Sequence, residues 1–384
     1  MNRCPACGTT YAPDARFCTR DGTKLVDVPA HGSMNATPSP DIRGTVPPAA
    51  PADATGLRQV VKPHMQTPVA TPALAQGSLV GQRLDGRYEI ERKLGEGGMA
   101  SVWLGRDVAS GERFAIKVLS ADLSTDANAM ARLRREASFG MRLAHPNICH
   151  IIRLGETEGG LVYVVMPFIA GEILSDRTNK RGQLDLGETV RFVRDIAAGL
   201  HLAHQIKIVH RDLKPENVMV RRLPDGREQA VVMDFGLAKE RRAGDELQKL
   251  TKTGIILGTP EFMSPEQLRG KPLDGRTDVY ALALMTYEML TGKLPFQGRN
   301  QQEVMIARLR GEPIPIRQAR PDIPFPPAVE AVLLKGMHRD PDQRFQSAPE
   351  FAQALAQAAS PQPPGAGSPA GEASGGILGK LFGR

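Results

Sequence analysis

The sequence predicts an α+β protein with a bilobal fold, in which a small β-rich lobe precedes a larger α-helical lobe. Short apolar runs of strand length dominate residues 88–166, whereas apolar residues at three- and four-residue spacing dominate the chain after residue 186. The chain has 384 residues, of which 41% are hydrophobic and 24% charged. This composition is close to the globular average, and the length is sufficient for a sizeable core.

Four apolar runs predict the strands of the first lobe. They span residues 88–93, 100–105, 114–119 and 161–166. Between the third and the fourth run, residues 128–143 carry apolar side chains at helical spacing, so we expect one helix among these strands.

Helices and one hairpin are expected in the second lobe. Residues 186–204 and 278–290 carry apolar side chains at helical spacing. Residues 218–220 and 231–233 are strand-like, and the Pro-Asp-Gly sequence at 224–226 predicts the turn between them.

Composition divides the chain into four parts. Residues 1–27 contain three of the four cysteines, and residues 28–80 contain nine prolines among small and polar residues. The last residues, 359–384, are mostly Pro, Gly, Ala and Ser. We therefore expect a small head at 1–27, a disordered linker at 28–80, a packed domain at 85–358 and a disordered tail.

Charge and hydropathy limit the classes of function. The net charge is +7, but Lys and Arg are interleaved with Asp and Glu, so a nucleic-acid partner is not favoured. No apolar run approaches the roughly 18 residues of a membrane span, and the N-terminus does not resemble a secretory signal. The expected location is the cytoplasm.

A glycine-rich stretch lies between the first two predicted strands. Gly95, Gly97 and Gly98 would let the backbone approach the phosphates of a ligand. By itself such a stretch is more often only a hairpin turn. It also opens no helix, so it matches the dinucleotide-binding fingerprint poorly.

The third predicted strand places a cation beside a small residue. Because strand side chains alternate, Ala115 and Lys117 share one face, and the neighbouring apolar residues point to the core. A lone strand lysine is more often solvated. However, the helical pattern of 128–143 turns Glu136 inward, and an inward carboxylate needs a cation, for which Lys117 is available.

The hairpin of the second lobe brings polar residues together. The first strand begins just after Asn217 and the second ends at Asp234, so an antiparallel pairing places these two side by side. Two oxygen ligands suit Mg²⁺. Just upstream, Asp212 can orient a hydroxyl nucleophile, and Lys214 can offset charge on a transferred phosphate.

These motifs, in this order and spacing, resemble the eukaryotic-type serine/threonine protein kinases over about residues 85–358. The resemblance implies that the three glycines cover the ATP phosphates and that Lys117, paired with Glu136, holds the α- and β-phosphates. It further implies that Asp212 accepts or positions the substrate hydroxyl and that Lys214 contacts the γ-phosphate. Asn217 and Asp234 would bind Mg²⁺ or Mn²⁺.

The same resemblance implies an adenine pocket. Its residues would be Val102, Ala115, the gatekeeper Met166, and the hinge residues Pro167 and Ile169. Proline keeps its carbonyl, so the adenine contact expected at Pro167 is retained.

Two sites depart from the family pattern, and one ion pair is implied by it. Ala100 replaces the third glycine of the loop, and Ser264 replaces the alanine of the usual Ala-Pro-Glu. The glutamate of that motif, Glu266, is expected to pair with Arg344 in the helical lobe.

Residues 214–217 and 258–262 are similar to the serine/threonine version of the family, so the expected acceptor is a Ser or Thr hydroxyl of a protein. Thr251 and Thr253 lie in the expected activation segment, and a phosphate on either would suit the guanidinium of Arg211. We therefore expect activation by autophosphorylation. The alternative is that both are ordinary loop threonines.

The head resembles a short zinc ribbon. Cys4 and Cys7 are followed by Cys18 and Asp21 with the same spacing, so a structural Zn²⁺ held by three thiolates and one carboxylate is expected. His31 is a rival fourth ligand, and unliganded thiols in a frayed terminus are the alternative. A protein partner would then bind the ribbon.

The leading interpretation is a bacterial serine/threonine protein kinase of signal transduction that phosphorylates proteins, itself included. A catalytically silent scaffold that binds ATP while the head recruits a partner is the alternative, and the intact set of catalytic side chains counts against it. A nucleic-acid-reading head is disfavoured by its few aromatic residues and four cations. A small-molecule kinase is disfavoured because 258–266 resembles a peptide-docking segment.

Overall fold

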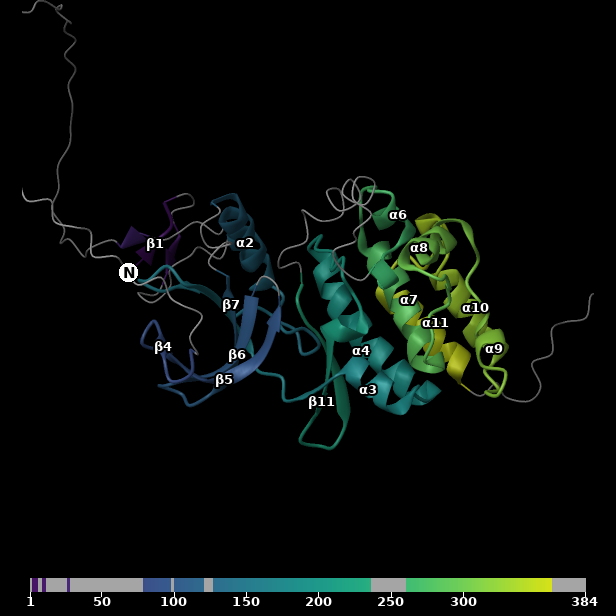
Figure 1. The fold of residues 1–384 in the computed structure, drawn as a ribbon, viewed down its shortest axis with the longest axis horizontal. Coiled ribbons are helices and arrows are strands. Elements are labelled where there is room, and N and C mark those ends of the chain that lie inside the picture. Colours follow the sequence, from purple (N-terminus) through teal and green to yellow (C-terminus); the bar gives the residue numbers. More distant parts are fainter. Residues whose placement is uncertain are drawn as a thin grey trace, which may run out of the picture.

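The computed structural model describes residues 2–5, 9–11, 26–27, 79–97, 100–120, 127–235 and 260–360. Figure 1 shows a strand-rich lobe, with β4 to β7 and α2, beside a lobe built mostly of helices. The two-lobe division predicted from the sequence is therefore confirmed. Among the described residues, no helix is both long and apolar enough to cross a lipid bilayer.

Two antiparallel sheets lie in the first half of the chain. The first contains the short strands β1 (Asn2–Arg3), β2 (Thr10–Tyr11) and β3 (Val26–Asp27), in the order β2-β1-β3. The second has six strands in the order β4-β5-β6-β7-β9-β8. They are β4 (Arg83–Leu84), β5 (Tyr88–Gly97), β6 (Ala100–Asp107), β7 (Arg113–Leu119), β8 (Arg153–Glu156) and β9 (Val162–Pro167).

The side chains of β7 alternate as the sequence predicts. Phe114, Ile116 and Val118 are buried in a cluster with residues of β5 and β9, whereas Ala115 and Lys117 on the other face are only partly buried. This alternation separates an apolar face of the sheet from the face that carries Lys117.

The helix of the first lobe, α2 (Ala127–Gly140), ends three residues before its predicted end. Gly140 lies where the chain leaves the helix. A Cβ at this position would lie 2.7 Å from Cδ1 of Ile151, so the absence of a side chain lets the helix end pack closely against the segment before β8.

The segment after α2 is bonded to the second lobe. Asn147 donates to the carbonyl of Ala230 at 2.8 Å and accepts from the amide of Val232 at 2.9 Å. The amide of Cys149 then donates to the carbonyl of Val232 at 2.8 Å. Residues 147–149 therefore lie along the second lobe's hairpin like a further strand.

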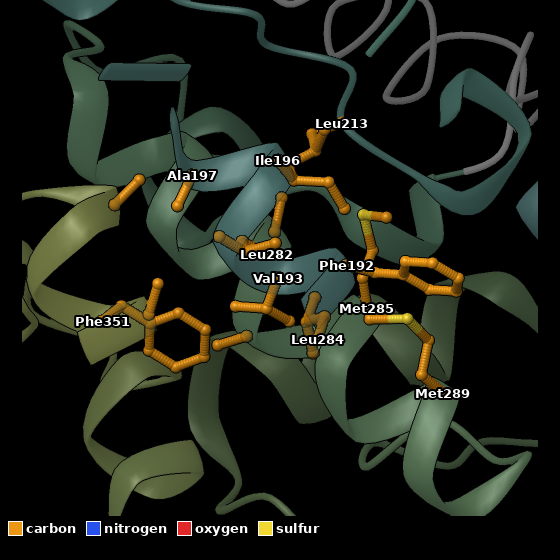
Figure 2. Packing of buried hydrophobic residues seen from close by; sticks show 14 of the residues in the cluster. Phe192, Val193, Ile196, Ala197, Leu213, Leu282, Leu284, Met285, Met289 and Phe351 are labelled. Atoms are coloured by element: carbon orange, nitrogen blue, oxygen red, sulfur yellow. The ribbon is translucent and has the colours of Figure 1, made fainter. Parts of the chain in front are cut away.

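The second lobe is organised around α4 (Leu186–Gln205) and α7 (Gly275–Thr291), which pack against each other and against α11. Figure 2 shows their contact, where Phe192, Val193 and Ile196 of α4 meet Leu282, Met285 and other residues of α7. The remaining helices are α3 (Leu174–Arg181), α6 (Pro265–Leu268), α8 (Gln301–Arg310), α9 (Ile316–Ala319), α10 (Pro327–Gly336) and α11 (Ala348–Ala359). Three-residue 3₁₀ turns lie at η1 (Pro215–Asn217), η2 (Pro260–Phe262) and η3 (Pro341–Gln343).

The predicted hairpin is confirmed as β11 (Val218–Arg222) and β12 (Glu228–Val232), with Val218 opposite Val232. A third strand, β10 (Gly171–Ile173), pairs with β11 and follows directly on the segment that connects the lobes. The hairpin therefore lies against the junction of the two lobes, with its open end toward residues 210–217.

Candidate active site

The loop before the hairpin brings three of the predicted site residues together. Nδ2 of Asn217 donates to the carbonyl oxygen of Asp212 at 2.7 Å and to its Oδ2 at 3.0 Å. Nζ of Lys214 lies 3.8 Å from the same Oδ2. One carboxylate oxygen of Asp212 thus faces both an amide and an ammonium, which fixes its direction.

A buried carboxylate on α7 holds this loop by its backbone. The side chain of Asp278 accepts hydrogen bonds from the amides of His210, at 2.8 Å, and Arg211, at 3.0 Å, and from Nε2 of His204 at 2.7 Å. Burial alone would raise the pKa of Asp278, but the His204 contact and the loop amides hold that pKa below its usual range. The loop is therefore anchored on an ionised group in the lobe's interior.

His210 connects the loop to the end of the hairpin. Its Nε2 lies 2.8 Å from the carbonyl oxygen of Met233, and its Nδ1 lies 3.3 Å from the amide of Asp212. A neutral imidazole with the proton on Nε2 satisfies both contacts, because Nε2 donates and Nδ1 accepts. The ring also packs edge-on against Phe235, with centroids 4.7 Å apart.

Asn217 and Asp234 lie at the open end of the hairpin, as the antiparallel pairing predicts. The amide of Met233, next to Asp234, donates to the carbonyl of Asn217 at 2.9 Å. Asp234 has a φ of +55°, a left-handed conformation that turns its side chain out of the strand direction. Its carboxylate is 41% exposed and so can reach a ligand between the lobes.

Lys117 reaches across from the first lobe to this carboxylate. Its Nζ donates to Oδ1 of Asp234 at 3.1 Å. The side chain of Glu136, which the sequence pairs with Lys117, lies outside the described residues. The cation of the sheet and the carboxylate of the hairpin therefore meet, although 117 positions separate them in the chain.

Apolar residues of the expected adenine pocket gather between the lobes. Met166 and Ile169 are buried in a cluster that also includes Val231 of the hairpin, and Ala115 packs against it. In the sheet, Ala115 pairs with Met166 and Val102 with Lys117. Gly95 and Gly97 lie at the end of β5, whereas Gly98 lies outside the described residues.

Cys149 is buried between the end of α2 and the hairpin. It lines a small pocket behind Met166 together with Gly140 and Phe235. Burial raises the pKa of the Cys149 thiol to about 12. The side chain therefore acts as a core residue rather than a reactive thiol.

The segment after the expected activation loop is fixed by an ion pair that the family resemblance implied. Arg344 donates to both carboxylate oxygens of Glu266, at 2.7 and 2.8 Å, and both residues are buried. Thr277 donates to the same carboxylate at 2.9 Å. The expected Glu266–Arg344 pair is therefore confirmed.

Several sequence predictions lie outside the described residues, including most of the linker at 28–80 and of the tail at 359–384. Thr251 and Thr253 are among them, and so are three of the four predicted zinc ligands, Cys7, Cys18 and Asp21. Cys4 is described and buried. Within the described part of the chain, no group of three or more His, Cys, Asp or Glu side chains is arranged to hold a metal ion.

The sequence analysis missed three residues that hold the loop directly or through a neighbour. They are Asp278, its partner His204, and Gln267, whose Nε2 donates to the carbonyl oxygen of Arg211 at 2.7 Å. Asp278 could have been found, because it opens a mostly apolar helical run and a buried carboxylate there requires partners. The other two carry no such signal, because their partners are backbone groups or residues far away in the sequence.

Comparisons with known proteins agree with this geometry. A model of the protein kinase domain matches residues 88–357. The serine/threonine-protein kinase pkn3 of Myxococcus xanthus is 37% identical over 272 residues, which are 71% of this chain and 50% of the relative. The serine/threonine-protein kinase PknB of Mycolicibacterium smegmatis is 38% identical over 274 residues, 70% of this chain and 42% of the relative.

A solved structure shares the fold. The crystal structure of the Mycobacterium tuberculosis PknI kinase domain matches with a TM-score of 0.57 at 28% sequence identity, over 74% of this chain and 100% of that domain. The chain spans half or less of the length of the two curated relatives. Since the kinase-domain model covers more than half of its residues, the chain belongs to the protein kinase family.

Proposed function

We propose that this protein is a serine/threonine protein kinase of signal transduction that transfers the γ-phosphate of ATP to Ser and Thr hydroxyls of proteins. The observation that carries the proposal is the meeting of Lys117, from the sheet, with Asp234, beside a loop that fixes Asp212, Lys214 and Asn217. The names of the relatives, all serine/threonine-protein kinases, support the choice of acceptor.

In the proposed reaction, Asp212 orients the acceptor hydroxyl and takes its proton. The hydroxyl oxygen forms a bond to the γ-phosphorus, and the bond from this phosphorus to the β,γ-bridging oxygen breaks. The bridging oxygen keeps the electron pair and leaves as part of ADP. Lys214, 3.8 Å from Asp212, is placed to offset the negative charge of the phosphoryl group as it moves.

The donor set at the hairpin fits a divalent cation with hard oxygen ligands. Asn217 uses its amide nitrogen on Asp212, so its amide oxygen remains for a ligand, and Asp234 contributes a half-exposed carboxylate. Asn217 and Asp234 would hold Mg²⁺ or Mn²⁺, which neutralises phosphate charge when bound. Lys117, released from Asp234, would then contact the α- and β-phosphates and pair with Glu136.

The remaining nucleotide contacts are assigned by position. Gly95, Gly97 and Gly98 would cover the phosphates. The adenine would lie against Val102, Ala115 and Met166 and bond to the backbone of Pro167 and Ile169. In support, Ala115, Met166 and Ile169 belong to one apolar cluster between the lobes.

The test is phosphate transfer from radiolabelled ATP with magnesium, to the protein itself and to a generic basic protein substrate. Wild type should label polypeptide, and Asp212→Asn should lose the activity by two or more orders of magnitude, in line with loss of a proton acceptor. Asp225→Asn, in the exposed hairpin turn, is the matched control and should retain activity. Failure of wild type to label any polypeptide would favour the catalytically silent scaffold.

Autophosphorylation of Thr251 or Thr253 is the proposed activating step. A phosphate there would add negative charge within reach of Arg211, beside the catalytic loop. Mass spectrometry of active wild type should find phosphate on one or both. Undiminished activity after both threonines are replaced with alanine, together with no phosphate on either threonine in wild type, would disprove this proposal.

The head at 1–27 is proposed to be a zinc ribbon held by Cys4, Cys7, Cys18 and Asp21, recruiting a protein partner. A disordered linker at 28–80 would join the head to a kinase domain at 85–358. A disordered tail at 359–384 would follow this domain. Elemental analysis should find one Zn²⁺ per chain, and Cys7→Ser should lose it. Zinc-free protein from zinc-replete cells would disprove the site. A cytoplasmic location remains part of this proposal.

A further inference from the structure

Gln267 is a polar residue on α6 that is only 5% exposed, and its amide and side-chain groups make three hydrogen bonds. Two of them form a capping box at the start of the helix. The amide of Gln267 donates to Oγ of Ser264 at 3.3 Å, and Oε1 of Gln267 accepts from the amide of Ser264 at 2.9 Å. Glutamate and glutamine serve equally in this motif.

The third hydrogen bond leaves the helix. Nε2 of Gln267 donates to the carbonyl oxygen of Arg211 at 2.7 Å. This carbonyl belongs to the peptide bond between Arg211 and Asp212, so the contact holds the orientation of the peptide plane that leads into Asp212. Glutamate could not make this bond when ionised, because a carboxylate only accepts hydrogen bonds.

The peptide plane at Arg211 needs such support. Arg211 has a φ of +66°, a left-handed conformation that costs energy for a residue with a side chain. Asp278 binds the amide of Arg211 from one side, and Gln267 binds its carbonyl from the other. The backbone amide and the backbone carbonyl of Arg211 are thus both held by buried side chains.

The other side-chain contacts of α6 and of the residues just before it are made with the body of the second lobe. Glu266 is tied to Arg344 near the end of the chain, and Arg308 of α8 donates to the carbonyls of Met263 and Glu261. These contacts fix the segment to the body of the second lobe. Gln267, by contrast, connects the same segment to the backbone of the catalytic loop.

We propose that Gln267 is a positioning residue for phosphoryl transfer, which couples the order of the segment after the activation loop to the placement of Asp212. The inference rests on the proposed kinase activity. It predicts that loss of the side-chain amide lowers kcat while nucleotide binding is kept, since Gln267 touches the loop of the proton acceptor and not the nucleotide pocket.

The Gln267→Glu variant separates this role from a purely structural one. The introduced carboxyl keeps the capping box, because it still accepts from the amide of Ser264. When ionised it meets the carbonyl of Arg211 as a second acceptor and repels it. When protonated it donates and restores the bond, and burial brings this protonation toward neutral pH.

Other charged or titratable groups lie on the elements that contact α6 and are common to wild type and variant. Arg211 and His210 lie on the catalytic loop, Asp278 on α7 and Arg308 on α8. Beside them, Glu266 is paired with Arg344. The ratio of variant to wild-type kcat at each pH cancels their titration, so a pH-dependent ratio reports the introduced carboxyl.

The experiment measures kcat and the KM for ATP of the full chain between pH 6 and pH 9. Gln267→Glu should lower kcat about tenfold or more at pH 8, and the kcat ratio should rise toward one as the pH falls to 6. The KM for ATP should change less than about threefold. Gln267→Leu should lower kcat at every pH, with a constant ratio.

Gln343→Glu, at an exposed position of η3, is the control and should give a ratio of one throughout. Wild-type kcat in both Gln267 variants would overturn the inference, as would a pH-independent loss that parallels loss of thermal stability and of nucleotide affinity. If Gln267→Glu does not fold, wild-type kcat in Gln267→Leu still overturns it. An inactive wild type would instead overturn the proposed function, and the inference with it.

Discussion

Buried carboxylates of the second lobe differ in whether a partner compensates their burial. Arg344 binds Glu266 with two hydrogen bonds, and three donors surround Asp278. Glu288 on α7, in contrast, has a buried Oε2 to which no described residue donates a hydrogen bond. Ionisation therefore stabilises the fold at the first two positions and opposes it at the third.

Arg344→Met tests the buried pair. The change leaves the charge of Glu266 uncompensated in the interior, so the free energy of unfolding should fall by about 3–5 kcal/mol at pH 7. Urea denaturation measures it. Arg339→Met, which breaks the exposed pair with Glu312, should cost less than about 1 kcal/mol. Equal losses in the two variants would contradict the importance of burial.

The same pair predicts an acid-sensitive stability. Burial opposes ionisation of Glu266, but the bonds from Arg344 outweigh it and lower the pKa below the usual 4.5. The stabilisation is therefore complete above pH 4.5 and is lost as the pH falls through the lower pKa of the folded state. The difference in free energy of unfolding between wild type and Arg344→Met should narrow as the pH falls, and the narrowing should continue below pH 4.5. A gap that is constant down to pH 3 would contradict this pKa shift.

Glu288 should behave in the opposite way. Burial, with smaller contributions from the charges of Glu216 and Glu261, raises its pKa to about 7. The folded state then retains a proton that the unfolded chain releases near pH 4.5, so this residue lowers stability as the pH rises from 4.5 through 7. The free energy of unfolding of Glu288→Gln, relative to that of wild type, should therefore rise by about 2 kcal/mol between pH 5 and pH 8. Urea denaturation at a series of pH values measures this difference. A difference in free energy of unfolding that does not change with pH would refute the raised pKa of Glu288.

At the scale of elements, the contact between α4 and residues 147–149 depends on one glycine. A Cβ at Gly199 would lie 2.9 Å from the carbonyl oxygen of Asn147 and 3.1 Å from Cγ1 of Ile148. The backbone carbonyl cannot move aside without losing its bond to the hairpin. The helix can therefore approach this segment only without a side chain at position 199.

Gly199→Ala should consequently destabilise the protein by about 1–3 kcal/mol, although alanine is the better helix former. Gly187→Ala on the same helix is the matched control, because a Cβ there would approach no backbone atom and only the side chains of Asp185, at 3.3 Å, and Arg191, at 3.8 Å. The control should be neutral or stabilising. Thermal unfolding of both variants checks the prediction. The prediction fails if the melting temperatures of the two variants shift in the same direction relative to wild type.

Sequence patterns predicted the elements with the most regular periodicity. The alternation of β7 and the spacing in α4 and α7 located these elements to within a few residues. The short strands β4, β8 and β10 were missed, because two to four residues cannot establish a period and their pairing depends on tertiary contacts.

The candidate site was predicted to a similar extent. The hairpin placed Asn217 beside Asp234 because antiparallel register is local. By contrast, the contact of Lys117 with Asp234 and the bond from Gln267 to Arg211 join distant parts of the chain, and only the packing of the lobes decides them.

At the scale of the whole molecule, the proposed nucleotide would bind both lobes at once. Lys117 and the glycine loop lie on the sheet, and Asp212, Asn217 and Asp234 lie on the second lobe. A ligand that contacts both halves of a fold and does not bind the unfolded chain stabilises it in proportion to the logarithm of its concentration.

We therefore expect a non-hydrolysable ATP analogue with Mg²⁺, at about 100 times its Kd, to raise the free energy of unfolding by about 2.7 kcal/mol. Lys117→Met should lose most of this gain at the same concentration. Lys180→Met, on the exposed surface of α3, should keep it. Equal thermal shifts in the two variants would show that Lys117 does not contact the nucleotide.

The bonding of residues 147–149 to β12 has a mechanical consequence. Since these residues are tied to the hairpin by backbone hydrogen bonds, the end of α2 near Gly140 is held close to the second lobe. If the sheet rotates relative to the second lobe when a nucleotide binds, α2 has to rotate about this fixed end. The end of the helix near Ala127 then moves farthest from its starting position.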